Sequence, residues 1–248
     1  MFGLAKRKPE RIATAPGECI YAVGDVHGRL DLLVSLLDRI EADTVSVAEG
    51  DAVRVIFLGD LIDRGPDSMA CMQIVQGLVE SGGAELLLGN HEDLLLRAVA
   101  GEAAAQAIWM EHGGRATLLE LGVEPIGDVE DPFDFGERIA KVLPDTLAPF
   151  LSALPKSADS GDYFFCHAGV RPRIGLDKQD ETDLYLIRDA FTGSQRWHGK
   201  MVVHGHSISE GVDIQPNRIG VDTGAYRTDV LSSVRLYGER VDVLQASV

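Results

Sequence analysis

The sequence lacks any apolar run approaching the roughly eighteen residues that a transmembrane helix needs, which excludes a membrane-spanning segment of that kind. The basic start of the chain, MFGLAKRKPER, is not followed by an apolar segment with a small-residue cleavage site. It therefore does not fit a secretory signal peptide, and we expect residues 1–17 to form a basic, flexible tail. Together these absences predict a cytoplasmic protein.

Cysteine is also scarce, with only Cys19, Cys71 and Cys166 in 248 residues. The number is odd and the spacing is not that of a metal site, so we expect buried thiols in a reducing compartment rather than a disulfide framework. None of the three lies in a phosphate-cradling cysteine loop, which argues against catalysis by a thiolate.

Positive charge is in short supply, because 23 Lys and Arg residues face 39 Asp and Glu residues and leave a net charge of −16. A surface this acidic argues against nucleic acid or an anionic membrane as a partner. An anionic substrate stays compatible with this charge only if the site carries its own cations. The sequence gives no indication of the oligomeric state.

The order of patterns along the chain predicts one α/β domain over residues 18–248. Short β-branched apolar runs alternate with helical stripes in the first half, which favours a parallel sheet. Residues 101–155 differ, since they read as helices interrupted by glycine and proline, and we interpret them as a helical insertion beside the sheet. The last strands, about 230–236 and 241–245, predict an antiparallel hairpin.

Three motifs carry the chemistry, and each follows an apolar run of strand length. They are GDVHG at 24–28, GDLIDRG at 59–65 and GNHE at 89–92. Polar side chains at the carboxyl ends of parallel strands meet at one edge of a sheet. His167 and His204 each end a later apolar run in a similar way. Oxygen and nitrogen ligands of this kind indicate a borderline divalent metal such as manganese, iron or zinc.

GDVHG, GDLIDRG, GNHE, the later HAG and VHGH together resemble the metallophosphoesterase signature of the PPP family of phosphoprotein phosphatases. Their order and spacing are most similar to compact bacterial and phage-type serine/threonine protein phosphatases. The resemblance covers the chain from about residue 20 to the C-terminal hairpin. It implies a calcineurin-like metallophosphoesterase sandwich of two mixed β-sheets flanked by helices, and a dinuclear metal centre.

Carried over residue by residue, the resemblance implies specific roles. One metal would be held by Asp25, His27 and Asp60, and the second by Asp60, Asn90, His167 and His204, with Asp60 bridging. His91 would be the catalytic acid, with Asp63 as its carboxylate partner, while Arg64 and Arg188 would grip the phosphoryl oxygens. Arg171 is a further expected substrate contact, although a plain surface arginine explains it as well. We expect His206 to lie outside the set of ligands.

The expected reaction is in-line attack on phosphorus by a hydroxide that two divalent ions, manganese first, activate. The preferred substrate is a serine or threonine phosphoprotein or phosphopeptide. The alternative is diadenosine tetraphosphate or another nucleotide. Tyr226 and Trp197 are the aromatic side chains that could stack on its bases. A catalytically silent phosphopeptide-binding module is a third hypothesis, which the complete ligand set disfavours.

Overall fold

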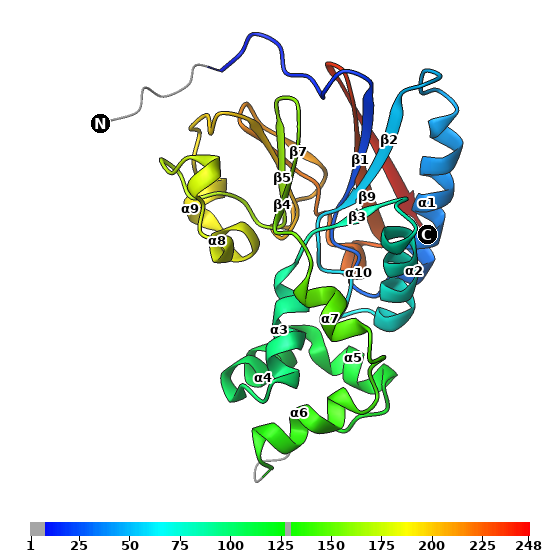
Figure 1. The fold of residues 1–248 in the computed structure, drawn as a ribbon, viewed down its shortest axis with the longest axis vertical. Coiled ribbons are helices and arrows are strands. Elements are labelled where there is room, and N and C mark those ends of the chain that lie inside the picture. Colours follow the sequence, from blue (N-terminus) through cyan, green and yellow to red (C-terminus); the bar gives the residue numbers. More distant parts are fainter. Residues whose placement is uncertain (1–7, 127–129) are drawn as a thin grey trace.

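The computed structural model describes residues 8–126 and 130–248. Two five-stranded mixed sheets pack face to face, and helices cover their outer faces (Figure 1). The two mixed sheets flanked by helices confirm the predicted fold class. In the part of the chain that is described, no helix has the length and hydrophobicity needed to cross a bilayer.

The first sheet has the strand order β10-β9-β1-β2-β3. Its strands are β1 (Glu18–Val23), β2 (Ala52–Phe57), β3 (Glu85–Leu86), β9 (Val230–Tyr237) and β10 (Arg240–Ser247). The three early strands run parallel to one another, and β9 lies antiparallel to both β1 and β10. The predicted parallel start and antiparallel C-terminal hairpin are therefore both present.

The second sheet has the order β4-β5-β6-β8-β7. Its strands are β4 (Ser157–Ser160), β5 (Tyr163–Cys166), β6 (Met201–His204), β7 (Asp213–Ile214) and β8 (Arg218–Gly220). Strands β5, β6 and β8 are mutually parallel, and the edge strands β4 and β7 are antiparallel to their neighbours.

Side-chain alternation along the central strands builds the core between the sheets. In β1, Ile20 and Ala22 face the second sheet, whereas Tyr21 and Val23 face the helices on the outer side. Because both faces of β1 are covered, the strand is apolar at almost every position, as expected for a central strand of a sheet that is buried on both faces. The three cysteines are free and buried, as the sequence predicted.

Helices α1 (Leu30–Thr44) and α2 (Ser68–Glu80) cover the outer face of the first sheet, and α8 (Glu181–Leu186) and α9 (Asp189–Thr192) lie outside the second (Figure 1). The remaining helices are α3 (Asn90–Val99), α4 (Ala103–Trp109), α5 (Arg115–Glu120), α6 (Pro132–Ala140), α7 (Leu147–Ser152) and α10 (Ala225–Thr228). Four of them, α4 to α7, come from residues 101–155, where the sequence predicted a helical insertion. A kinked segment, Met110–Gly114, joins α4 to α5.

The N-terminal segment is less free than a flexible tail would be. Residues 1–7 lie outside the described part, but Ala13 donates its amide to Asp162 and Thr14 is bonded to Gly238. The described segment from residue 8 to β1 is therefore tied to both sheets, and the expected free tail does not extend to residue 17.

Candidate metal centre and active site

The candidate ligands lie at one edge of the sandwich, because each follows the end of a parallel strand. Asp25 follows β1, Asp60 follows β2 and Asn90 begins α3 just after β3. From the second sheet, His167 follows β5 and His206 comes two residues after β6. All five are buried. The sequence prediction that several strand ends meet therefore holds for five strands from both sheets.

The loops at this edge hold non-glycine residues in the left-handed region of backbone space. Positive φ values occur at His27 (48°), Asp60 (53°), Asp63 (74°), Arg64 (68°) and His206 (60°). Such conformations are uncommon for residues with a side chain, and they tend to cluster at functional sites.

The Glu92 carboxylate holds the loop around Asp60 in place. It accepts hydrogen bonds from the amides of Asp60 (2.9 Å) and Leu61 (2.8 Å). Gly89 also has no room for a side chain, because a Cβ there would collide with Asp60 Oδ1. This close approach explains why the third motif begins with a glycine.

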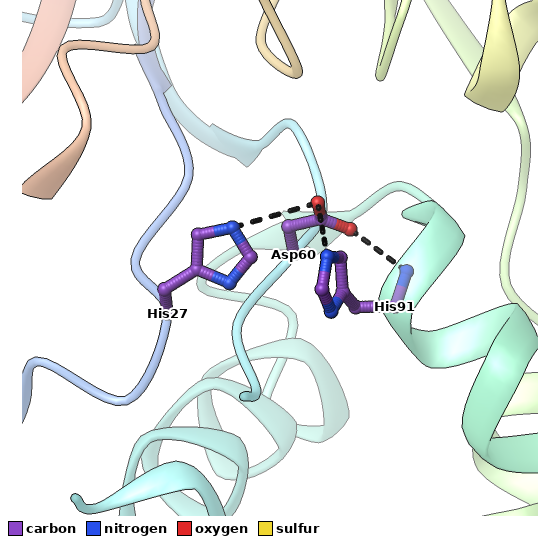
Figure 2. A group of neighbouring side chains, drawn as sticks. All are labelled: His27, Asp60 and His91. Carbon is purple, nitrogen blue, oxygen red and sulfur yellow. Dashed lines mark hydrogen bonds and ion pairs between the residues drawn. The ribbon is translucent and has the colours of Figure 1, made fainter. Parts of the chain in front are cut away.

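Asp60 lies at the centre of the cluster (Figure 2). Its Oδ2 atom is 3.3 Å from His167 Nε2, 3.7 Å from His27 Nε2 and 3.9 Å from His91 Nε2. Two groups of side chains present their ligand atoms within 4.8 Å of one another: His27 with Asp60 and His91, and Asp60 with His167 and His206. Asp60 belongs to both groups, as a carboxylate shared by two metal ions would.

The histidines are oriented by their second ring nitrogen. Nδ1 of His27 lies 2.8 Å from the Ile62 carbonyl, and Nδ1 of His167 lies 2.9 Å from the Leu58 carbonyl. Donation from Nδ1 to a carbonyl leaves Nε2 as the ligand atom, which is the usual arrangement of metal-binding histidines. His27 Nε2 is buried and has no hydrogen-bond partner among residues 8–126 and 130–248. The donor set therefore fits a divalent cation.

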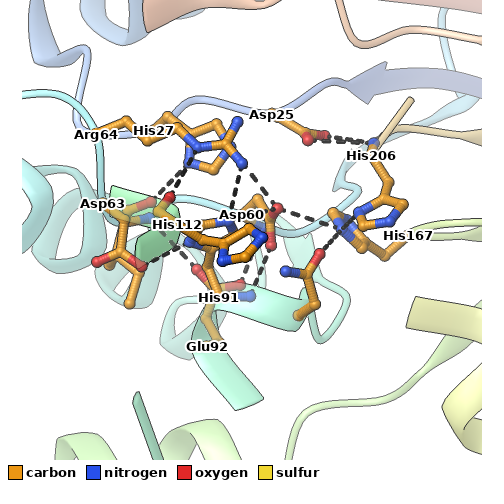
Figure 3. Close-up of polar contacts among 12 residues, drawn as sticks. Asp25, His27, Asp60, Asp63, Arg64, His91, Glu92, His112, His167 and His206 are labelled. Carbon is orange, nitrogen blue, oxygen red and sulfur yellow. Dashed lines mark hydrogen bonds and ion pairs between the residues drawn. The ribbon is translucent and has the colours of Figure 1, made fainter. Parts of the chain in front are cut away.

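The second sheet contributes His167 and His206 to the cluster (Figure 3). Asn90 Oδ1 and His206 Nδ1 each lie 3.1 Å from His167 Nε2. Both carboxylate oxygens of Asp25 accept from the His206 amide at 3.1 Å. Burial and the nearby Asp222 raise the pKa of Asp25 well above its usual value. Crowded carboxylates of this kind favour a bound cation.

The pKa values of Asp60 and His167, at the centre of the cluster, are shifted in opposite directions. Although burial acts against charge at both residues, their mutual attraction lowers the pKa of Asp60 and raises the pKa of His167 to about 9. Burial and the charge of His91 lower the pKa of His27 well below its usual value. Burial likewise lowers the pKa of His206 to about 2, with His167 adding to the effect.

His204, the predicted ligand, is not part of this group, and His206 is found in its place. Side chains alternate along β6, so that Met201 and Val203 point between the sheets whereas Val202 and His204 point outward. The His204 ring packs edge-on against Phe191, with 5.1 Å between the centroids.

The sequence does contain a signal for His206. It directly follows a glycine, as Asp25, Asp60 and Asn90 do. A backbone φ of 60° then turns His206 into the cluster.

His91 and Asp63 form a hydrogen-bonded pair, with 2.6 Å between Nδ1 and Oδ2. The Asp63 carboxylate also accepts from Trp109 Nε1 (2.8 Å) and from Thr117 Oγ1 (2.6 Å). Burial opposes charge on His91, but Asp60 and the hydrogen bond to Asp63 outweigh it and raise the pKa of His91. Trp109 and Thr117 belong to the insertion, and no local motif in the sequence marks them.

Arg64 lies beside His91 (Figure 3), and three contacts hold it there. Its Nη2 lies 3.2 Å from His91 Nε2, and its Nε donates to the His112 carbonyl at 3.2 Å. The guanidinium stacks on Tyr226, with 4.7 Å from Cζ to the ring centroid. A Cβ at Gly113 would collide with the Arg64 side chain, so this glycine permits the insertion to approach so closely.

The other two arginines predicted to bind substrate, Arg171 and Arg188, lie in different surroundings. Arg171 is exposed and forms a bidentate ion pair with Asp183 on α8, at 2.5 and 2.6 Å. The structure therefore does not bring Arg171 into the cluster. Arg188 precedes α9 and lines a cavity together with Ser207, the residue after His206. Its expected role in binding phosphate stays a prediction.

Comparison with known proteins gives a consistent result. A profile of the calcineurin-like phosphoesterase family matches residues 20–243. The asymmetrical bis(5'-nucleosyl)-tetraphosphatase PrpE of Bacillus subtilis is 28% identical over 231 residues, covering 86% of this chain and 88% of that protein.

Two solved structures have a similar fold. One, described as a candidate diadenosine tetraphosphatase, has a TM-score of 0.62 and 23% identity and covers 95% of this chain and 98% of its own. A protein serine/threonine phosphatase of Saccharomyces cerevisiae has a TM-score of 0.55 and 15% identity, with coverage of 97% and 84%. At these identities the two structures indicate a shared fold and no more.

Proposed function

The chain belongs to the calcineurin-like phosphoesterase family, and we propose that it is a metal-dependent hydrolase of bis(5'-nucleosyl) tetraphosphates. The observation that carries this proposal is the similarity, over 86% of the chain, to a relative named as such a tetraphosphatase. The likeness to a serine/threonine phosphatase rests on fold alone, at 15% identity. The comparisons therefore favour the second expected substrate, a dinucleoside tetraphosphate, over the first, a phosphoprotein.

The residues that would hold two metal ions are the buried cluster around Asp60, namely Asp25, His27, Asp60, Asn90, His167 and His206. Manganese, iron and zinc all suit this mixture of carboxylate, amide and imidazole ligands. Bound there, two divalent cations would add positive charge for the phosphate oxygens and make hydroxide available at neutral pH.

The chain's own side chains supply the remaining functions. Arg64, fixed between His112 and Tyr226, presents its guanidinium to the phosphate that undergoes attack. The raised pKa of His91 favours its protonated form, which can give a proton to the departing oxygen. Asp63 orients the ring through Nδ1, so that Nε2 is the atom that donates. Arg188 binds a further phosphate oxygen.

Arg188→Ala should raise KM for phosphate esters and weaken inhibition by inorganic phosphate. Hydrogen bonds to charged groups are worth about 1.5–3 kcal/mol, so we expect a change of roughly tenfold to a hundredfold. Lysine should restore only part of the affinity, because the bidentate fork is lost. Steady-state kinetics with phosphate as the inhibitor measure this effect. Arg39→Ala, an exposed arginine on α1, is the control, and phosphate inhibition that stays at the parent value would place Arg188 outside the site.

The substrate proposal is tested with protein reconstituted with manganese, and separately with iron and zinc. We expect a higher kcat/KM on diadenosine tetraphosphate than on phosphoserine and phosphothreonine peptides, by at least tenfold, or about 1.4 kcal/mol. Product analysis by chromatography gives the bond that is cleaved. A preference of that size for the peptides would instead support a protein phosphatase.

A further inference from the structure

The helical insertion places two polar side chains against the acid pair of the site. Trp109, the last residue of α4, and Thr117, in the first turn of α5, both donate hydrogen bonds to Asp63. Asp63, Trp109 and Thr117 are each fully buried. The insertion therefore supplies hydrogen-bond donors to the interior of the site, which a plain structural cap would not need.

These donors hold both oxygens of the Asp63 carboxylate. Oδ2 accepts from Trp109 Nε1 at 2.8 Å and lies 2.6 Å from His91 Nδ1. Oδ1 accepts from Thr117 Oγ1 at 2.6 Å. Rotation of the carboxylate would break these bonds in a buried site, where a lost partner costs about 1–3 kcal/mol. The oxygen that faces His91 is therefore fixed in place.

A closed ring of hydrogen bonds supports the Thr117 hydroxyl. This hydroxyl has one proton and an ionised carboxylate only accepts, so the proton goes to Asp63 Oδ1. Thr117 Oγ1 also lies 3.0 Å from Ser68 Oγ, which must then be the donor in that contact. Ser68 Oγ in turn accepts from the Asp63 amide at 2.8 Å. The ring therefore holds Asp63 at its main chain and at its side chain together.

The position of Asp63 decides where His91 directs its second nitrogen. Because Nδ1 is bonded to Asp63, Nε2 faces Asp60 at 3.9 Å and Arg64 at 3.2 Å. A general acid works only when its donor atom is within hydrogen-bond reach of the leaving oxygen. A misplacement of about 1 Å can cost roughly a hundredfold in rate.

We propose that Thr117 and Trp109 are positioning residues of the phosphoesterase reaction, which direct His91 at the leaving oxygen by fixing Asp63. This inference rests on the proposed function, in which His91 is the acid. It gives the helical insertion a part in catalysis. Since a basic leaving group needs a proton more than a stable anion does, the effect of both residues should grow with the basicity of the leaving group.

The test replaces Thr117 by valine, which keeps the shape of the side chain and removes the hydroxyl. The measured quantity is kcat/KM on phenyl phosphate divided by kcat/KM on p-nitrophenyl phosphate, because phenolate is the more basic of the two leaving groups. We expect this ratio to fall about tenfold, which is a part of the roughly 10²–10⁴ that a general acid contributes. Thr117→Ser, which keeps the hydroxyl, should retain the parent ratio.

Two further readouts separate positioning from general damage to the site. Metal per chain, measured by mass spectrometry, and inhibition by inorganic phosphate should stay at the parent values in Thr117→Val, because the hydroxyl bonds to Asp63 and Ser68. An unchanged ratio, or a fall in bound metal, overturns the proposal.

Thr14→Val is the matched control for the loss of a buried hydroxyl. Thr14 is 6% exposed, donates to the Glu18 carbonyl at 2.9 Å and accepts from the Gly238 amide at 3.0 Å. It precedes the start of β1, whereas the metal cluster lies beyond the end of that strand. The ratio should stay at the parent value in this variant, and an equal fall in Thr14→Val and Thr117→Val overturns the proposal.

Trp109→Phe tests the second donor, because it keeps an aromatic ring and removes the indole nitrogen. The ratio should fall as it does in Thr117→Val. Trp197→Phe is the control, since Trp197 Nε1 has no hydrogen-bond partner among residues 8–126 and 130–248 and its side chain lines a separate cavity. A ratio that falls equally in both tryptophan variants overturns the role of Trp109.

A double variant shows whether Thr117 acts through His91. In a chain that already carries His91→Asn, Thr117→Val should lower the ratio no further, whereas residues that act independently have additive effects. A further fall of the same size overturns the proposal. If His91→Asn alone lowers the ratio and Thr117→Val does not, this inference fails alone. If His91→Asn leaves the ratio unchanged, the acid role fails and this inference with it. Neither substrate is a nucleotide, so these outcomes are independent of the proposed preference for tetraphosphates.

Discussion

Replacing Asp60 by asparagine should remove nearly all phosphoesterase activity and lower the metal content of the protein. Asp60 Oδ2 lies within 3.9 Å of three imidazole Nε2 atoms and belongs to both candidate metal groups. Asparagine keeps the size of the side chain and an oxygen for the His91 amide, but it removes the negative charge that two cations would share. Since outer-shell changes at metal sites already cost about 10–100-fold, the loss here should exceed a hundredfold.

The measurements are turnover of p-nitrophenyl phosphate and metal per chain by mass spectrometry. Asp93→Asn is the control, because this acid lies on the same helix as Asn90 but pairs with Arg97 at 3.5 Å, away from the cluster. The control should retain both metal and activity. An Asp60→Asn protein with two metals and normal turnover would exclude a bridging role.

The fold was predictable from local patterns because its central strands are apolar on both faces. β1 and β2 each end in a buried apolar run, and both lead into a glycine followed by an aspartate. Parallel strands bring such ends to the same edge, so strand order along the chain was enough to predict that Asp25 and Asp60 would meet. The apolar run before the third motif extends from Ala84 to Leu88, but only its residues Glu85–Leu86 are paired with β2 as strand β3.

The error at His204 has a geometric cause. A histidine at the end of a strand points to one face or the other according to its register, and β6 places His204 on the same face as Val202. The sequence shows two histidines in VHGH, and the glycine before His206 was the signal that the motif-based prediction overlooked. The left-handed conformation of His206 decides which of the two turns inward, and the glycine before it has no room for a Cβ beside the Asp25 carboxylate.

Other parts of the site depend on contacts between distant segments. Asp63 is held by Trp109 and Thr117, which are separated from it by 46 and 54 residues. Neither spacing corresponds to a helical or strand period, so pattern analysis could not have connected them. Arg171 illustrates the opposite case, because the sequence left both a substrate contact and a plain surface arginine open, and its pairing with Asp183 on a nearby helix favours the second.

His91→Asn should keep the metal content of the protein yet lose about 10²–10⁴ in kcat on alkyl phosphates, which is the usual contribution of a general acid. His91 is 1% exposed, and its Nδ1 is held by Asp63 at 2.6 Å, which leaves Nε2 to face Asp60 and Arg64. Asp60 and the hydrogen bond to Asp63 raise the pKa of His91, which favours the protonated ring that the departing oxygen needs. The activity of the parent should therefore decline as the pH rises through the raised pKa, and the variant should lack that decline.

The size of the loss should depend on the leaving group, because a good leaving group needs little help from an acid. Alkyl phosphates should suffer most, and p-nitrophenyl phosphate and diadenosine tetraphosphate, whose leaving groups are stable as anions, should suffer least. His112→Asn is the matched control, since its exposed ring bonds to the Ile108 carbonyl, and the contact with Arg64 uses the main-chain carbonyl of His112, which the substitution keeps. Equal losses on all three substrates, or a fall in bound metal, would make His91 a binding residue or a ligand. The geometry would allow His91 to be a metal ligand, because its ligand atom lies within 4.8 Å of the ligand atoms of His27 and Asp60.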